Sequence, residues 1–548
     1  MKDYDDSIAF LGHWGRFQQA VFFLLCASIV PNGFGVFFTV FLTDTPLHHC
    51  LVPEVNLSQA WRDATIPIEV VDGKQELSSC SRYRLDVVRN LSAQGLVPGR
   101  DVNLTDLEQE GCVDGWSYSK DIYQSTIVSE FDLVCSDQWK QPFTTTLLLL
   151  GVVFGSFVSG QLSDRFGRKP VLFATMAVQT FFTIVQIFSP SWTVFSILFF
   201  MSGLGQISNY ISGFVLGAEI LTGNVRDLFS TMGISLGFAV GYMLLPLFAY
   251  FLRDWKSLLL GLSLPCFAYI PLWWFIPESP RWLLSQGRLE EAEAIIRHAA
   301  KINKVEAPQV IFEDYNETNT HPENHPNFFD LLSTRNIRNT TIILCLLWLT
   351  LSTGYFGLSL NTPQLHANPY ISCFISAAVE VPAYISCWLA QCYLPRRVSV
   401  ISFLLLEAVS LYSIQLVPQS LSYLSFALEM LGKFAVSASS TLMYAYTAEL
   451  YPTVLRNTAT GTCCTVSRVG SCLTPFLLKL GLYFKYLPNI ILGTLAAVSA
   501  FAAFFLPESF GQPLPQTIEQ MFKLKRPACS AQITALVLSI SIQRALLA

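Results

Sequence analysis

Apolar residues gather in twelve runs along the chain, each long enough to cross a bilayer as a helix. The first six lie near 20–43, 142–162, 171–189, 192–214, 229–251 and 257–277. The other six lie near 340–360, 371–391, 398–417, 422–446, 458–480 and 486–507. A helix needs about 20 predominantly apolar residues to span the hydrocarbon core. The pattern therefore predicts an all-α membrane protein with twelve transmembrane helices.

Polar sequence separates these runs into a simple order of segments. We expect an N-terminal segment at 1–19, a first transmembrane helix at 20–43, a loop domain at 44–141, helices 2 to 6 at 142–277, a polar helical loop at 278–339, helices 7 to 12 at 340–507 and a tail at 508–548. The segment before the first run is acidic, which predicts a retained helix there and not a cleaved signal peptide.

Composition and charge fit a membrane protein and give the direction of insertion. Hydrophobic residues make up 52% of the chain and charged residues only 13%, against roughly 25% charged in soluble domains. The net charge of -5 and the lack of a basic tract exclude nucleic acid as a partner. Basic residues follow the even-numbered helices at Arg165, Arg168, Lys169, Arg226, Arg396, Arg397 and Arg456. Both termini are therefore expected in the cytoplasm and the loop domain outside.

The loop domain carries signs of an oxidising compartment. Cys50, Cys80, Cys112 and Cys135 predict two disulfides with three possible connectivities, the alternative being free thiols. Sequons at Asn56, Asn90 and Asn103 predict glycosylation of the same segment.

The two groups of six runs repeat each other in sequence. Glu219 and Glu449, Arg226 and Arg456, and the Pro-Glu-Ser triplets at Pro277 and Pro507 are each 230 residues apart. The repeat predicts two six-helix halves in the same orientation with a site between them, a design typical of transporters.

Arg468 lies near the middle of the run 458–480, where it would sit at membrane depth. An arginine at the centre of a membrane helix costs about 2.5 to 3.5 kcal/mol and usually faces a cavity or a partner. We expect a substrate carboxylate to neutralise it in a water-filled pathway. The alternative is a structural ion pair with Glu380 or Glu429, which also lie in predicted helices.

Several motifs identify the chain as a member of a known superfamily. GQLSDRFGRKP at 160–170 resembles the loop between helices 2 and 3 of the major facilitator superfamily. STIVSEFDLVC at 125–135, PESPRWLLSQGR at 277–288 and ELYPTVLRN at 449–457 are similar to the organic cation, anion and zwitterion solute-carrier family. The opening MKDYDDSIAFLGHWGRFQ, with IVPNGF, GQISNY and GYFGLSL, resembles its carnitine/organic-cation (novel type) branch.

The resemblance implies the major facilitator fold, with two pseudo-symmetric halves of six helices and a disulfide-bonded loop domain between helices 1 and 2. It favours pairing of Cys50 with Cys112 and of Cys80 with Cys135. The branch's nucleotide-binding-like stretch reads GAEILTGNV here, without its lysine, so nucleotide binding is not expected. The tail also departs from the branch, which argues against scaffold-protein binding through the C-terminus.

A carnitine-like zwitterion needs an arginine for its carboxylate and aromatic faces for its quaternary ammonium. The resemblance places arginine at the position of Arg468 in carnitine and anion transporters. The candidates for the aromatic cage are Tyr210, Phe238, Trp348, Tyr355 and Tyr444, each of which could instead serve only in packing.

A group of amides in the first half is a candidate sodium site: Asn32, Gln179, Gln206 and Asn209. Their oxygens suit a hard cation, and the family's carnitine transporters couple to sodium. The alternative is hydrogen bonding between helices, which amides also provide in membranes.

Charged residues at the cytoplasmic helix ends resemble the family's gating charges: Asp164, Arg165, Arg168, Glu219, Arg226, Glu449 and Arg456. We expect them to pair across the two halves in the outward-open state. A merely solvated turn is the alternative for the 160–170 loop.

The sequence therefore predicts a plasma-membrane symporter that takes up carnitine or a related betaine with Na⁺ by alternating access. Its expected partners are a small zwitterionic or cationic solute, Na⁺ as coupling ion and the lipid bilayer, with no cofactor. An ergothioneine or organic cation carrier of the same branch is one alternative, and a non-transporting glycosylated surface receptor is another. We expect no enzyme activity, because no nucleophile–base pair or metal constellation appears in the sequence.

Overall fold

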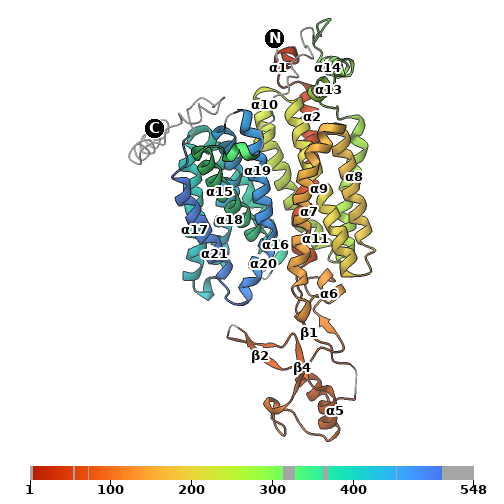
Figure 1. Cartoon of the computed structure of the whole chain (residues 1–548). Coiled ribbons are helices and arrows are strands. Elements are labelled where there is room, and N and C mark those ends of the chain that lie inside the picture. The colour runs from red at the N-terminus through yellow and green to blue at the C-terminus, as the bar shows by residue number, and fades with distance from the viewer. Residues whose placement is uncertain are drawn as a thin grey trace.

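The computed structural model describes residues 4–53, 56–71, 73–312, 328–361, 368–451 and 453–508. Its long helices form two groups that stand side by side, and the loop domain projects from one end of them (Figure 1). The short helices α1 (Tyr4–Ser7), α13 (Pro280–Ser285) and α14 (Leu289–Asn303) lie at the opposite end. We call these two ends the loop-domain end and the opposite end.

The first group of helices comes from the first half of the chain. Its members are α2 (Arg16–Phe37) with α3 (Thr39–Leu42), α7 (Lys140–Phe166), α8 (Arg168–Gln186), α9 (Trp192–Ile220), α10 (Gly223–Leu228) with α11 (Ile234–Phe251), and α12 (Trp255–Tyr269). A π-helical turn at Phe229–Gly233 joins α10 to α11, so these segments form one continuous rod.

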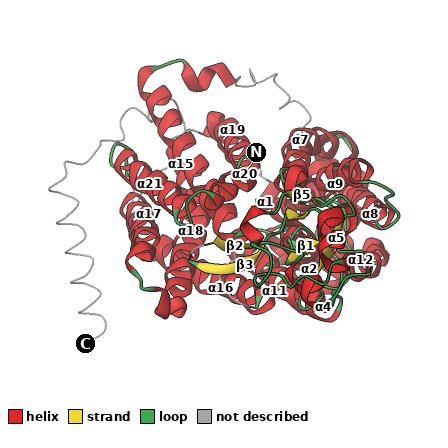
Figure 2. Cartoon of the chain, turned by 90° about the horizontal axis from the view of Figure 1, so that it is seen from below, coloured by secondary structure: helices red, strands yellow, loops and turns green. Residues whose placement is uncertain are grey.

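The second group comes from the second half of the chain. Its members are α15 (Arg335–Leu360), α16 (Pro369–Tyr393), α17 (Arg396–Ser413), α18 (Ser422–Leu450), α19 (Thr453–Cys472) with α20 (Thr474–Lys479), and α21 (Leu487–Ala503). Seen along the bundle, the two groups again lie beside each other (Figure 2). The predicted all-α class with two halves of six helices is confirmed.

Among the described residues, eight helical segments are long and apolar enough to cross a membrane, judged by length and composition alone. The helices α8, α18 and α19 are not among them. Helix α18 carries Glu429 and Lys433, and α19 carries Arg468. Polar helices within a membrane bundle mark the places where side chains face protein or water in place of lipid.

Glycines allow the helices of the first half to approach closely. A Cβ at Gly241 of α11 would lie 2.0 Å from the carbonyl oxygen of Val30, and one at Gly33 of α2 would lie 2.3 Å from that of Phe238. Small residues at such crossings let the two backbones touch, which is how membrane helices gain packing contacts. Helices α2 and α11 are therefore fixed to each other by van der Waals contact.

Buried apolar side chains form one cluster within each half and a third between them. The third cluster contains Phe37, Tyr242 and Leu245 from the first half and Tyr370 and Ala377 from the second. It lies toward the loop-domain end, because it also contains residues of the segment that returns from the loop domain. The halves are therefore packed together at that end.

The loop domain is built on three short antiparallel pairs of strands. These are β1 (His48–Cys50) with β6 (Trp116–Tyr118), β2 (Ile68–Val71) with β3 (Lys74–Leu77), and β4 (Ser81–Tyr83) with β5 (Gln109–Gly111). Helices α4 (Gln59–Ala64), α5 (Leu85–Ala93) and α6 (Ile127–Phe131) complete it. Its small core centres on Trp61, Tyr83 and Val88.

Two disulfides support this small core, as is common in extracellular domains. They join Cys50 to Cys112 and Cys80 to Cys135, so the pairing expected from the resemblance is confirmed. The side chains of Asn56, Asn90 and Asn103 are all exposed, and their glycosylation stays a prediction.

The contact between α2 and α11 gives a test of the fold. Replacing Gly241 with leucine should lower the yield of folded protein from cells several-fold, because overpacking costs about 1 to 3 kcal/mol and a loss of about 1 to 2 kcal/mol already changes cellular abundance by such a factor. Fluorescence-detected size-exclusion chromatography of the full chain measures the folded fraction. Gly461→Leu is the matched control, since Gly461 lies exposed on α19 with no heavy atom within 4 Å of its Cβ position. Equal yields from the two variants would contradict this packing.

Candidate functional site

Arg468 projects from α19 to the boundary between the two halves. Its guanidinium Nη1 donates a hydrogen bond of 2.7 Å to the hydroxyl of Ser156 on α7, in the other half. Within the described residues no carboxylate lies within 4.0 Å of this guanidinium. Arg468 is only partly buried. The cation is thus held by a neutral hydroxyl, and its remaining donors can bind another acceptor.

The two rival partners of Arg468 have other contacts. Glu380 on α16 forms a salt bridge of 3.3 Å with Lys433 on α18, and both side chains are fully buried. Glu429 accepts a hydrogen bond of 3.3 Å from the amide of Asn489 on α21. The alternative of an ion pair between Arg468 and either glutamate is therefore absent from this structure.

Sequence reasoning missed Lys433, although the signal was present. Lys433 lies inside the predicted run 422–446 in the same way that Arg468 lies inside 458–480. Its ammonium also bonds the hydroxyl of Ser359 and lies 4.3 Å from the ring centre of Tyr355. From the first half, the rings of Tyr242 and Phe37 stand 5.2 and 5.6 Å away.

The predicted aromatic cage divides into two groups. Tyr355 belongs to the first, because its hydroxyl donates to Glu380 at 2.5 Å and its face takes the Lys433 ammonium. Phe238 lies beside it, with its ring centre 6.0 Å from that of Phe37. This group already holds a cation of the protein itself, so it is not free for a substrate ammonium in this conformation.

The second group surrounds Arg468. Tyr210 on α9 and Tyr444 on α18 both lie within electrostatic range of its guanidinium. Trp348 packs edge-on against Tyr444 with ring centres 4.6 Å apart, and its indole N–H donates to Thr447 at 3.0 Å. Tyr444 is 50% exposed, so an aromatic face is open to a ligand beside the arginine.

The four candidate sodium ligands come from three helices of the first half. In the amide orientation that satisfies both of its polar atoms, Gln206 donates to the backbone carbonyl of Gly35 at 3.0 Å and accepts the backbone N–H of Val36 at 3.1 Å, both on α2. Gly35, one turn after Asn32 on α2, lies against both Gln206 and Gln179, whose atoms are 3.3 and 3.4 Å from its Cβ position. Asn209 follows one turn after Gln206 on α9 and is completely buried. The structure thus brings Asn32, Gln179 and Gln206 together, with Asn209 one turn away.

Three of these amides have side-chain oxygens without a hydrogen-bond partner among the described residues: Asn32 Oδ1, Gln179 Oε1 and Asn209 Oδ1. Buried polar atoms are nearly always bonded to protein, water or an ion. Gln179 also lines a small cavity with Gly35, Thr183 and Ser202. The arrangement provides oxygen ligands of the kind that a hard cation takes.

The predicted gating charges of the first half lie at the opposite end and bind one another. Arg168 on α8 forms salt bridges of 2.8 Å with Asp164 and 2.9 Å with Glu219. Arg226 bonds Asp5 of the N-terminal segment at 3.1 Å. Arg165 lies over the ring of Phe166, 5.4 Å from its centre.

In the second half, Arg396 binds Glu449 at 3.3 Å. The side chain of Arg456 lies outside the described residues. Among the side chains that are described, the ion pairs of these charges stay within one half and its N-terminal segment. The side chains that the structure describes show no ion pair between these charges of the two halves, and the pairing expected in the outward-open state stays a prediction.

The Pro-Glu-Ser repeat has a structural role that the sequence did not reveal. Glu278 accepts the backbone N–H groups of Arg168 and Lys169 at 3.2 and 3.3 Å, at the start of α8. Glu508 accepts those of Arg396 and Arg397 at 3.0 and 3.1 Å, at the start of α17. A carboxylate at a helix N-terminus satisfies unpaired donors and the helix dipole. Burial raises the pKa of the Glu278 carboxyl by more than these N–H groups lower it, so the pKa lies above its usual value.

Contacts between the halves gather toward the loop-domain end. Tyr370 on α16 donates to the carbonyl of Ile122 at 2.8 Å and stacks on Phe41, with ring centres 5.5 Å apart. Thr146 on α7 donates to the carbonyl of Cys472 at 3.0 Å. The Arg253 guanidinium also lies 5.5 Å from the ring centre of Tyr370. These contacts together close the bundle at that end.

Comparisons with known proteins agree with this architecture. Residues 114–522 match the model of the sugar (and other) transporter family. The chain is 55% identical to organic cation/carnitine transporter 2 of Rattus norvegicus, over 96% of this chain and 95% of that relative. It is 53% identical to solute carrier family 22 member 4 of Mus musculus, over 98% of each.

The chain belongs to the organic cation/carnitine transporter family. This transporter also has the fold of the xylose transporter XylE from E. coli. An inward-open structure of XylE covers 92% of this chain and 99% of XylE, with a TM-score of 0.61 and 12% identity. A partially occluded inward-open structure gives a TM-score of 0.59, with 91% and 100% covered and 12% identity. The family and the fold are those of multi-pass membrane transporters and not of enzymes.

The buried pair of Lys433 and Glu380 predicts a large loss of stability when one partner is removed from the transporter. Lys433→Met should destabilise it by about 3 to 5 kcal/mol, because the Glu380 carboxylate is left buried without a cation. The double variant Lys433→Met with Glu380→Gln should recover much of this loss. Thermal melting of the detergent-solubilised protein measures the effect, with exposed Lys301→Met on α14 as the control. Unchanged melting of Lys433→Met would contradict the pair.

Proposed function

We propose that the protein is a sodium-coupled symporter of the plasma membrane that takes up carnitine or a related zwitterionic quaternary ammonium compound. The observation that carries this proposal is Arg468, a cation between the two halves that has a hydroxyl and, among the described residues, no carboxylate as its partner. A substrate carboxylate supplies the missing charge, and charge-assisted hydrogen bonds to an arginine are among the stronger ones in proteins.

The second group of aromatic residues completes the substrate site. Tyr210 and Tyr444 lie near the guanidinium, and Trp348 packs against Tyr444. An ammonium over aromatic faces gains about 0.5 to 2 kcal/mol, more when desolvated. A zwitterion can therefore place its carboxylate on Arg468 and its ammonium against these rings. The relatives' names, which include carnitine and organic cations, support this class of solute.

The positions of the contacts support alternating access. The halves meet through hydrogen bonds and ring contacts at the loop-domain end, while the described charges at the opposite end pair within each half. With the loop domain outside and both termini in the cytoplasm, this conformation faces inward. The exposed sequons and the two disulfides of the loop domain support that orientation.

The unpartnered amide oxygens support a sodium site in the first half. Asn209 and Tyr210 are neighbours on α9, so an ion held by Asn209 would fix the helix that carries part of the substrate site. Coupling between two sites is reciprocal, since each ligand must raise the affinity for the other by the same factor.

Removing the charge of Arg468 tests the substrate site. Arg468→Gln should lower the uptake efficiency (kcat/KM) for radiolabelled carnitine at least about tenfold, because a hydrogen bond to a charged group contributes about 1.5 to 3 kcal/mol. Uptake is measured in cells and divided by the amount of surface-labelled protein. The control is Arg62→Gln, on the exposed surface of α4. If Arg468→Gln takes up carnitine as efficiently as wild type, the proposal is rejected. If the wild-type protein transports only tetraethylammonium or only ergothioneine, the alternative of an organic cation carrier or of an ergothioneine carrier is correct instead.

Removing one amide tests the sodium site. Asn209→Ala should raise the sodium concentration needed for half-maximal uptake about tenfold, while saturating sodium restores much of the rate. The matched control is Gln186→Ala, because Gln186 is also a buried unpartnered amide on α8. It lies seven residues from Gln179, about 10 Å along the helix. A lower maximal rate with an unchanged sodium dependence would assign Asn209 to packing alone.

A further inference from the structure

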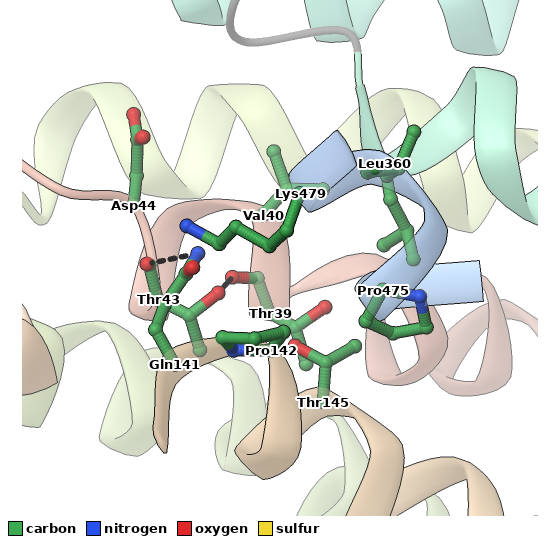
Figure 3. A pocket seen from close by; sticks show the side chains of 11 residues that line it. Thr39, Val40, Thr43, Asp44, Gln141, Pro142, Thr145, Leu360, Pro475 and Lys479 are labelled. Atoms are coloured by element: carbon green, nitrogen blue, oxygen red, sulfur yellow. Dashed lines mark hydrogen bonds between the residues drawn. The ribbon is translucent and has the colours of Figure 1, made fainter. Parts of the chain in front are cut away.

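A pocket lies at the loop-domain end, between the two halves and apart from Arg468. From the first half it is lined by Thr39, Val40, Thr43, Asp44, Gln141, Pro142 and Thr145, and from the second by Leu360, Pro475, Leu478 and Lys479. Figure 3 shows Lys479 and Pro475 of the second half opposite Thr43, Gln141 and Thr145 of the first, with Asp44 at the edge of the group. The pocket is partly open to solvent. Its walls therefore come together only when the halves meet at this end.

Lys479, the last residue of α20, brings a positive charge to the pocket. Its side chain extends across the pocket toward Thr43 and Gln141 (Figure 3). No hydrogen bond or salt bridge of its ammonium is found within the described part of the chain. Asp44 is the nearest charge that acts on it, and the two groups are not within 4.0 Å of each other.

Asp44 brings a negative charge to the same pocket. Its carboxylate accepts the hydroxyl of Tyr123 at 2.6 Å and the backbone N–H of Thr45 at 3.0 Å. These two donors fix the carboxylate in place without neutralising its charge. The pocket thus holds a cation on the wall of one half and an anion on the wall of the other.

Two further polar atoms in the pocket lack partners. The Gln141 amide donates to the carbonyl of Thr43 at 2.9 Å, but its Oε1 accepts no hydrogen bond among the described residues. The Thr39 side chain is only 1% exposed, and its Oγ1 has no partner there either. Leaving such atoms unpaired costs about 1 to 3 kcal/mol each, so they are expected to meet a ligand or water.

We propose that this pocket is an outer binding site for a small zwitterion, separate from the central site at Arg468. The carboxylate of the ligand binds the Lys479 ammonium, and its positive group lies by Asp44 and Gln141 Oε1. A simple cation would be repelled by Lys479 and a simple anion by Asp44, whereas a zwitterion meets an opposite charge at each end. The choice of ligand rests on the proposed function, because it is the same class of solute.

The position of the pocket gives the ligand a particular place in transport. Because α20 supplies Lys479 and the segment after α3 supplies Asp44, a bound zwitterion bridges the two halves. The outer site is complete while the halves are closed at the loop-domain end and the central site opens toward the opposite end. The outer site is thus a feature of this conformation, and a ligand bound there stabilises it.

Binding stoichiometry tests this proposal. The full-length transporter is placed in lipid nanodiscs, which leave both faces accessible, and equilibrium binding of radiolabelled carnitine is measured. We expect two carnitine molecules per wild-type chain and one per chain in Lys479→Gln and Asp44→Asn. The remaining central site reports that these variants are folded. Lys485→Gln is the matched control, since Lys485 lies over the ring of Tyr486 outside the pocket and should leave both sites.

Arg468→Gln separates the two proposals in the same measurement. It should keep the outer site and lose the central one, and adding Lys479→Gln should abolish the remaining binding. One molecule per wild-type chain that Lys479→Gln keeps and Arg468→Gln loses overturns the outer site, and so do two molecules per chain in Lys479→Gln. One molecule per wild-type chain that Lys479→Gln loses and Arg468→Gln keeps rejects the central site and keeps the outer one.

Discussion

The neutralisation of charge inside the helix bundle is the constraint on which the rest of this structure depends. Lys433 has a carboxylate, a hydroxyl and three aromatic rings around its ammonium. Arg468, at comparable depth, has a serine hydroxyl. Removing a charge from water costs several kcal/mol unless partners replace the water. The first cation is therefore structural, and the second is left with capacity for a negatively charged ligand.

The distribution of contacts follows from the need of the halves to move. In the part of the chain that the structure describes, the ion pairs of the bundle join residues of the same half, as in Arg168 with Glu219 and Lys433 with Glu380. Between the halves the contacts include hydroxyl to carbonyl, arginine to hydroxyl, ring to ring, and cation to ring, as in Lys433 with Tyr242. A neutral hydrogen bond contributes about 0.5 to 1.5 kcal/mol net, so a few of them can break and re-form. Each half can then move as a rigid unit.

The sequence repeat acquires a physical meaning in the same way. Glu278 and Glu508 each hold the N-terminus of a helix whose first arginine, Arg168 or Arg396, binds Glu219 or Glu449. The repeated motif thus joins three helix ends within one half. Because the contacts described above lie within one half, they do not restrain its movement relative to the other half.

The sequence by itself determined the number and type of the helices, the two halves and the loop domain, and it placed the charge of Arg468 inside a helix. Those features depend on local composition and on residue spacing, which the chain carries directly. Only the tertiary structure decided which partner each charge has, because partners such as Ser156 and Arg468 are 312 residues apart. The tertiary structure also showed that Lys433 occupies the face of Tyr355, and that Lys479 and Asp44 line one pocket. Such pairs arise where two halves meet in space, and no spacing along one helix specifies them.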